Sequence, residues 1–266
     1  MTSGKQSKRI RAAKPPPPVR STDRMRQASP RVLAIAGGLI ALAAVAVVLG
    51  VVLTGGDTNE AETPTIGSLT NALPGATEVH ELLDGIPQAG NVLGEPDAPV
   101  TIYEYIDAQC PFCRQFETEG MPILIERYVR TGKAKVELRP IAFIGADSER
   151  GRAMMIAAGE QGKMFNVSHL LYAHQGAENS GWLSDDLVTR VAASIPGMDV
   201  PRLLADRGAS TVADTAREFE DAARTDGVNS TPTILVGKSG EKAALVTLET
   251  ATDPAPVAAA IDAALP

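Results

Sequence analysis

The stretch IDAQCPFCRQF, residues 106–116, contains the only two cysteines of the 266-residue chain, Cys110 and Cys113. Two thiols separated by two residues can be half of a metal site, a structural disulfide, a chance pair or a redox couple. The spacing alone does not choose among these, so the compartment and the surrounding fold decide the interpretation.

The charge of the chain is distributed unevenly. Residues 1–31 carry nine Lys or Arg against one Asp, whereas the rest of the chain carries 16 basic and 31 acidic residues. Between them, residues 32–53 form a run of 22 without any charge, and about 20 apolar residues in a helix span the ~30 Å core of a bilayer. A basic flank stays on the cytoplasmic side of such a span, which would place the acidic body on the far side.

A cleaved signal peptide is the alternative for this run, but its apolar region is only ~7–15 residues long. We therefore expect a retained single-pass anchor in a plasma membrane, with a cytoplasmic N-terminus and an extracytoplasmic body. The membrane topology explains the basic arm, so we expect no nucleic-acid partner.

An extracytoplasmic location lets a disulfide form and persist. A structural disulfide that closes two residues gains little, because its stabilisation grows with loop length. A metal site needs further ligands, and His80, His169 and His174 show no ligand spacing around the cysteines. These arguments favour a redox couple over a structural or incidental pair, and we expect neither a metal ion nor a cofactor.

The chain is predicted to consist of four parts. Residues 1–31 read as a disordered cytoplasmic arm, residues 32–53 as the transmembrane helix, and residues 54–84 as a tether with a short helix at TEVHELLD. Residues 85–266 form the folded domain, which includes an all-helical insertion over about residues 147–207.

The patterns around the cysteines predict a β-α-β unit. Residues 86–94 suggest an edge strand, residues 100–107 alternate as a strand does, and residues 110–131 read as a helix with a kink near Pro122. Residues 134–143 give the next strand, so the two long strands should be parallel with a right-handed crossover.

After the insertion, a helix is expected over residues 210–227. Two short strands, TPTILVGK (residues 231–238) and AALVTLET (residues 243–250), should form a hairpin. A last helix, PAPVAAAIDAAL, closes the chain. The sum is a single α/β domain with a helical insertion.

The predicted helix gives the two sulfurs different chemistry. Cys110 lies at the helix start, where free N–H groups and the helix dipole stabilise a thiolate and lower the thiol pKa. Pro111 suits the first helical turn because its missing N–H costs nothing there. Cys113 lies almost one turn further in, so we expect Cys110 to be the attacking or attacked sulfur and Cys113 to resolve the mixed disulfide.

The strand, the CPFC helix and the later GVNSTPTILV (residues 227–236) together resemble the thioredoxin superfamily, and the helical insertion resembles its DsbA-like branch. The resemblance covers about residues 86–265 and implies a thioredoxin-like fold. It also implies a Cys110–Cys113 redox disulfide, and a cis-proline pair, Thr231 and Pro232, that offers backbone hydrogen bonds to an extended substrate.

Two further residues are candidates for supporting roles. Glu104 shares a predicted strand face with apolar residues, six positions before Cys110, where the superfamily keeps an acid that assists proton transfer. If Glu104 is buried, its pKa should be raised. The pair Pro111–Phe112 sets the redox poise in such proteins, and because Phe112 has no side-chain donor we expect a weaker oxidant than with His there.

The remaining candidate functional residues are better explained by ordinary packing. His169 and His174 lie on a predicted insertion helix and read as polar or satisfied core residues. Met154, Met155 and Met164 have helical spacing, which favours core packing over a Met-rich binding surface.

The function we expect is that of a disulfide oxidase for exported cysteine-containing proteins. Its implied partner for reoxidation is a quinone-linked membrane oxidase of the DsbB or vitamin K epoxide reductase-like type. A reductase or isomerase on the same fold, and a non-enzymatic chaperone or scaffold, remain as alternatives. A dimerisation domain, usual for isomerases of this lineage, has no room in residues 54–84.

Overall fold

The computed structural model describes residues 64–266, which fold as a unit of their own. The predicted arm, the predicted membrane span and the first part of the predicted tether lie outside the described residues. Among the helices of residues 64–266, none combines the length and the apolar character needed to cross a bilayer.

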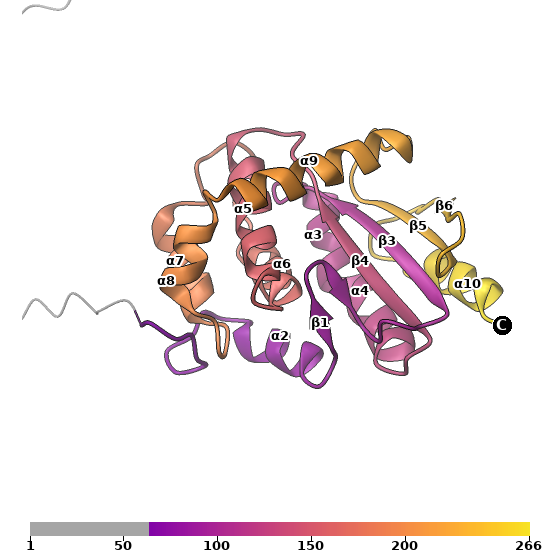
Figure 1. Ribbon diagram of the computed structural model, residues 1–266, viewed down its shortest axis with the longest axis horizontal. Coiled ribbons are helices and arrows are strands. Elements are labelled where there is room, and N and C mark those ends of the chain that lie inside the picture. Colours follow the sequence, from indigo (N-terminus) through magenta and orange to yellow (C-terminus); the bar gives the residue numbers. More distant parts are fainter. Residues whose placement is uncertain (1–63) are drawn as a thin grey trace, which may run out of the picture. The chain divides into compact units, whose positions relative to one another are not determined.

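A mixed six-stranded sheet forms the centre of the described unit, in the order β1-β2-β4-β3-β5-β6 (Figure 1). Its two central strands are long, and the strands at both edges have only two or three residues. The strands are β1 (Gln88–Ala89), β2 (Val92–Leu93), β3 (Val100–Ile106), β4 (Ala134–Pro140), β5 (Thr233–Lys238) and β6 (Ala244–Val246).

The predicted β-α-β unit is confirmed. β3 and β4 pair in parallel along their whole length, from Val100 opposite Ala134 to Ile106 opposite Pro140. The predicted C-terminal hairpin is also present, because β5 pairs antiparallel with β6 and, on its other side, antiparallel with β3. Parallel pairing of β3 and β4 requires the connecting helix to return along the sheet, so the helix that follows β3 starts at its carboxyl end.

The helix between β3 and β4 runs from residue 111 to residue 129 and changes its pitch along the way. It consists of α3 (Pro111–Gln115), the π-helical η1 (Phe116–Gly120), α4 (Met121–Leu124) and the π-helical η2 (Ile125–Val129). The first wide turn comes directly before Pro122, where the kink was predicted. Proline has no N–H for the regular hydrogen bond, and a widened turn accommodates that loss.

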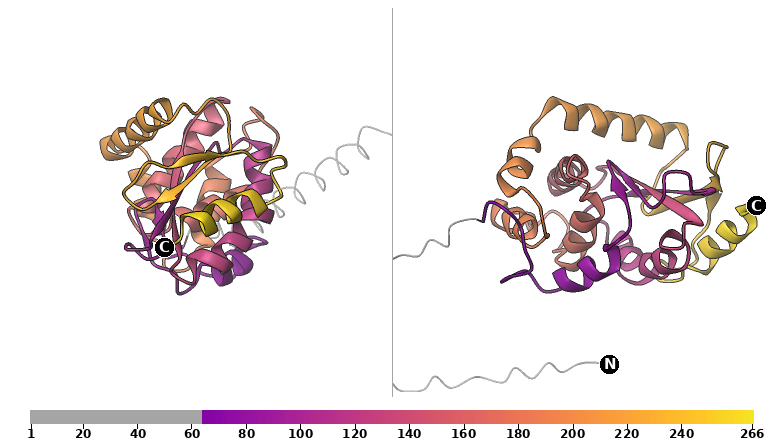
Figure 2. Two further views of the ribbon diagram at one scale, coloured as in Figure 1. Left: turned by 90° about the vertical axis from the view of Figure 1, so that its right-hand side faces the viewer. Right: turned by 60° about the horizontal axis from the view of Figure 1, so that its bottom comes forward.

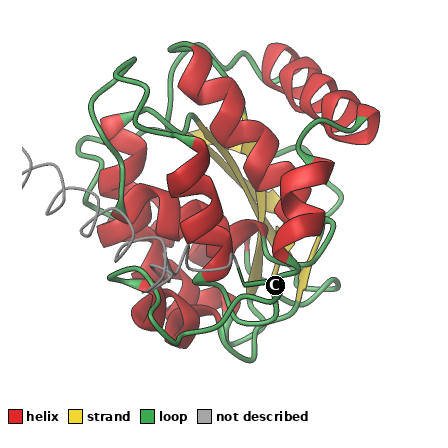
Figure 3. Cartoon of the chain, turned by 90° about the vertical axis from the view of Figure 1, so that its left-hand side faces the viewer, coloured by secondary structure: helices red, strands yellow, loops and turns green. Residues whose placement is uncertain are grey.

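The insertion is entirely helical, as predicted, and lies beside the sheet (Figure 3). Its helices are α5 (Ala146–Gly159), α6 (Met164–Ala173), α7 (Asp185–Ala193) and α8 (Val200–Asp206). Met154, Met155 and Met164 are buried in its core, so the packing interpretation of these methionines is confirmed.

Two further helices cover opposite faces of the sheet (Figure 2). α9 (Ser210–Thr225) packs on α5 and β4, and α10 (Ala255–Ala264) packs on β5 and β3, on the same side as α4. Apolar residues of both helices are buried against the sheet, among them Phe219 of α9 and Ile261 of α10.

The predicted edge strand over residues 86–94 is wrong in detail, because the chain forms a tight hairpin there. β1 pairs antiparallel with β2, and β2 pairs antiparallel with β4. Gly90, between β1 and β2, has a φ of 57°, a left-handed conformation that glycine adopts without strain. A single glycine at this position therefore helps to reverse the chain.

The folded unit also begins earlier than the predicted boundary at residue 85. α2 (Ala76–Leu83) forms where the short helix was expected, but it packs against α6 of the insertion. Leu73 and Leu83 are buried, and Ile66 pairs with Asp199 in an isolated β-bridge. The second part of the predicted tether, residues 64–84, is thus a component of the core.

Candidate functional site

The two cysteines lie where the carboxyl end of β3 meets the start of α3. Cys110 is the N-cap residue of α3, and its Sγ accepts a hydrogen bond from the backbone N–H of Cys113 at 3.3 Å. Pro111 occupies the first turn, as predicted. Both cysteines are free thiols, and Cys110 is 4% exposed against 0% for Cys113. The difference in exposure is small, so their reactivity differs through electrostatics.

The pKa of Cys110 is lowered to about 6. The largest cause is a hydrogen bond from the Cys113 thiol, and backbone N–H groups of Cys113 and Phe112 add to it. Burial acts in the opposite direction but is outweighed. Cys110 is therefore mostly a thiolate at neutral pH, and a thiolate is the form that attacks disulfides and leaves from them.

The pKa of Cys113 is raised well above its usual value. The first cause is burial, and the hydrogen bond and charge of Cys110 add to it. Cys113 consequently holds its proton while Cys110 loses one. The pair carries a single negative charge, on the outer sulfur.

The predicted proline pair lies directly opposite this sulfur. The Thr231–Pro232 peptide bond is cis, and Sγ of Cys110 lies 3.2 Å from the carbonyl oxygen of Thr231, to which its protonated form donates. The antiparallel pairing of β5 with β3 produces this contact, because Thr233 begins β5 opposite Tyr105 near the end of β3. Residues 121 positions apart in sequence thus meet at one sulfur.

A surface hollow of about 490 Å³ lies next to the pair. Phe112, which is 59% exposed, lines it with Gln115, and Thr231 and Pro232 line it as well. The segment of residues 248–251 completes the lining of the hollow. A partly apolar trough beside Cys110 can hold an extended polypeptide close to the thiolate.

The insertion holds the loop between β3 and α3, a role that no sequence pattern predicted. Gln175 donates to the carbonyl oxygens of Ala108 (2.9 Å) and Cys110 (3.0 Å), and the Tyr172 hydroxyl donates to that of Asp107 (2.9 Å). The buried Asp107 carboxylate in turn accepts four hydrogen bonds. Their donors are the N–H groups of Gln109, Phe143 and Ile144 and the hydroxyl of Ser148.

Glu104 is fully buried in the middle of β3. Burial raises its pKa well above the usual range, and the negative charge of Glu117 acts in the same direction. Glu117 was not among the predicted site residues, although a signal existed. It follows Cys113 by four positions, which places both residues on one face of the helix.

Within residues 64–266, no group of three or more His, Cys, Asp or Glu side chains is arranged to hold a metal ion. The structure brings together Cys110, Cys113, Pro111, Thr231 and Pro232, with Phe112 at the rim. Glu104 lies buried in the core. Their geometry serves exchange between thiols and disulfides.

Comparisons with known proteins agree with this geometry. A family model described as "Thioredoxin" matches residues 88–262. "Probable disulfide bond formation protein D" of Bacillus anthracis is 28% identical over 147 residues, which cover 54% of this chain and 68% of that protein.

Two solved structures show the same fold. BdbD from Bacillus subtilis, in its oxidised form, has a TM-score of 0.56 at 21% identity, covering 67% of this chain and 96% of that one. The α-DsbA1 protein of Wolbachia pipientis has a TM-score of 0.55 at 20% identity, covering 68% of this chain and 92% of that one.

The chain therefore belongs to the thioredoxin family. Its fold is thioredoxin-like with a helical insertion, as the sequence resemblance implied. More particularly, it is a DsbA-like protein thiol–disulfide oxidoreductase.

Proposed function

We propose that this oxidoreductase is an extracytoplasmic oxidase that introduces disulfides into exported proteins. The observation that supports the direction of the reaction most is the stabilised thiolate of Cys110. Stabilising the thiolate stabilises the reduced enzyme, and an enzyme with a stable reduced form has a strongly oxidising disulfide.

In the proposed reaction, a substrate thiolate attacks Sγ of Cys110 in the Cys110–Cys113 disulfide. The S–S bond breaks, Cys113 leaves as a thiolate and takes up a proton, and the substrate is joined to Cys110. A second substrate thiolate then attacks the first substrate sulfur, and Cys110 leaves as the stabilised thiolate. Two electrons pass from the substrate to the enzyme, and the substrate gains a disulfide.

The hollow beside Thr231 and Phe112 supports an extended, cysteine-containing segment of an unfolded protein as the substrate. The backbone at the cis pair would align that segment with Cys110. We propose that reoxidation comes from a quinone-linked membrane oxidase of the DsbB or vitamin K epoxide reductase-like type. Anchoring by residues 32–53 would keep both enzymes in the same plasma membrane, and the charge asymmetry around that run supports this arrangement.

The test measures the redox midpoint of the full chain against glutathione, followed by oxidation of reduced, unfolded ribonuclease. An oxidase has a midpoint well above the ~−270 mV of thioredoxin and restores disulfides to the substrate stoichiometrically. Cys110→Ser should abolish transfer, and Cys113→Ser should trap the mixed disulfide. A midpoint at or below that of thioredoxin, or repair of scrambled ribonuclease alone, would replace the oxidase by a reductase or an isomerase.

A further inference from the structure

Three buried titratable side chains form a cluster in the core. They are Glu104 of β3, Glu117 of η1 and His169 of α6, and they are 0%, 1% and 4% exposed. Nδ1 of His169 lies 3.3 Å from Oε2 of Glu117. Three elements distant in sequence thus bring two carboxyls and an imidazole together inside the core.

The cluster is short of hydrogen bonds. Within the described part of the chain, neither oxygen of Glu104 nor Nε2 of His169 has a hydrogen-bond partner, and Oε2 of Glu117 has only its contact with Nδ1 of His169. A buried polar group without a partner destabilises the fold, and most buried polar groups in proteins are paired. His169 lies in the core, as one of its two expected interpretations had it, but its Nε2 has no partner there.

The outer end of the cluster meets a second hollow, of about 340 Å³. Glu117 and His169 both line it, together with Val79 and Leu82 of α2 and Pro122. This hollow is distinct from the one beside Phe112 and Thr231, because the two share no lining residue. The imidazole of His169 thus lies between the interior carboxyls and an opening beside α2.

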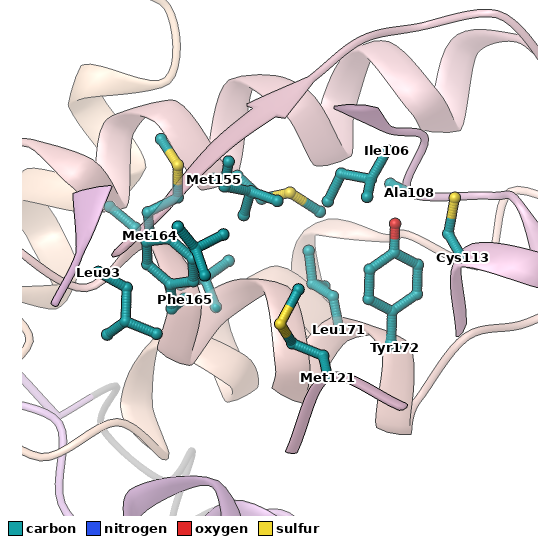
Figure 4. Packing of buried hydrophobic residues seen from close by; sticks show 14 of the residues in the cluster. Leu93, Ile106, Ala108, Cys113, Met121, Met155, Met164, Phe165, Leu171 and Tyr172 are labelled. Atoms are coloured by element: carbon teal, nitrogen blue, oxygen red, sulfur yellow. The ribbon is translucent and has the colours of Figure 1, made fainter. Parts of the chain in front are cut away.

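The inner end of the cluster approaches the sulfurs through Tyr172. Burial raises the pKa of the Tyr172 hydroxyl well above its usual value, and the nearby Cys113 and Glu117 add to this. Figure 4 shows its ring beside Cys113. Its hydroxyl donates to the carbonyl oxygen of Asp107, which ties the ring to the loop before Cys110.

The proposed reaction requires a proton at the inner sulfur. When Cys113 leaves as a thiolate, burial disfavours its charge, so it must take up a proton; when the disulfide re-forms, it must release one. During both steps a polypeptide covers Cys110 and the hollow beside Phe112. The proton therefore needs a second route.

We propose that Glu104, Glu117 and His169 form a proton relay, in which His169 exchanges protons between Glu117 and solvent in the hollow beside α2. The inference rests on the proposed exchange reaction and adds a residue and an outlet to it. His169 acts through Glu117 and touches neither sulfur, so it is a positioning residue. Histidine suits this place, because imidazole takes up and releases protons near neutral pH.

The groups that act on His169 come from the elements packed around α6. Glu117 faces it from η1, and Glu104 lies behind Glu117 on β3. Glu78 of α2 lines the same hollow, and Tyr172 lies one turn along α6 itself. Carboxyl groups thus lie on both the inner and the outer side of the imidazole.

The test isolates the step that needs Cys113. The full chain is reduced and then mixed with glutathione disulfide, and acid quenching with alkylation follows the conversion of the Cys110 mixed disulfide into the internal disulfide. The variants are His169→Gln and His169→Ala, with His80→Gln of α2 as the matched histidine control. Alkylation of Cys110 and the redox midpoint are measured on the same samples.

We expect both His169 variants to slow ring closure, the conversion of the Cys110 mixed disulfide into the internal disulfide, by at least about tenfold at neutral pH. Tenfold is the lower limit because general acid–base catalysis usually contributes about a hundredfold or more. The pH dependence of the rate should also differ from that of the parent chain in both variants. Imidazole in the buffer should restore the rate of His169→Ala, whose hollow can admit it, and leave His80→Gln unchanged. Cys110 alkylation and the midpoint should stay at their parent values.

Ring closure at the parent rate in His169→Gln, with the parent pH profile, would overturn the relay. So would a parallel loss of Cys110 alkylation, which indicates a structural defect. Should His169→Ala fail to fold, His169→Gln decides alone through its pH profile. Failure of the parent chain itself to exchange disulfides would refute the proposed function instead, so the two failures are distinguishable.

Discussion

Protonation of Cys110 should selectively destabilise the reduced form of the protein. The pKa of this thiol is lowered to about 6 in the fold, against ~8.5 for a free cysteine. A folded pKa below the unfolded one gives stability that is complete above the unfolded value and is lost as the pH falls through the folded value. The relevant window therefore lies between about pH 5 and pH 8.5.

The size of the effect follows from the shift. One pKa unit corresponds to about 1.36 kcal/mol, so the shift would give the reduced form about 2.5 kcal/mol between pH 5 and pH 8. Solvent screens part of the charge on the sulfur, which lowers the expected change to roughly 1.5 kcal/mol. The oxidised form has no thiol, so it should show no such change.

Denaturant unfolding of the reduced and the oxidised full chain at several pH values measures this difference. Groups far from the sulfurs titrate alike in both forms and cancel. Cys110→Ser, which keeps Cys113 but removes the titrating group, should lose the pH dependence of the reduced form. A difference between the two forms that stays constant from about pH 5 to pH 8, or that changes in the opposite direction, would refute the reasoning and remove the basis of the oxidase proposal.

Two further substitutions test the surroundings of the pair. Glu104→Leu should raise the free energy of unfolding at pH 7 by roughly 1–3 kcal/mol, because the raised pKa of this carboxyl means that its contribution is complete in acid and lost as the pH rises. In urea titrations this gain in stability should disappear below about pH 4. The exposed control Glu119→Leu should show no gain. A gain that persists in acid would contradict the burial argument. Gln175→Ala should cost about 2 kcal/mol, the sum of two hydrogen bonds, in both redox forms, whereas exposed Gln115→Ala should be neutral, and equal stabilities of the two variants would show that Gln175 does not hold the loop.

The sequence was sufficient to predict the frame of the molecule. Periodicity located β3, β4 and the helix between them, and CPFC with TPT identified the cis pair that meets Cys110. These features depend on local patterns or on a motif that recurs throughout a superfamily, so one sequence carries them.

Features that depend on tertiary contacts were missed. Residues 64–84 have a polar, tether-like composition, and only the docking of α2 on α6 shows that Leu73 and Leu83 belong to the core. The contact between Glu117 and His169 joins helices distant in sequence and leaves no periodic trace. The role of Gln175 could not be predicted either, because its partners are backbone carbonyls, which every residue has.

The short edges of the sheet have a consequence for the proposed action on unfolded chains. A long, flat edge strand offers a row of free backbone groups on which another polypeptide can add as a further strand, and this is how aggregates are seeded. β1 has two residues and β6 has three. A substrate released from Cys110 would find too few free backbone groups at either edge to add as a further strand, although Leu245 of β6 is exposed. Binding of an unfolded substrate would then stay limited to the site at Cys110 and would not extend along the sheet edges.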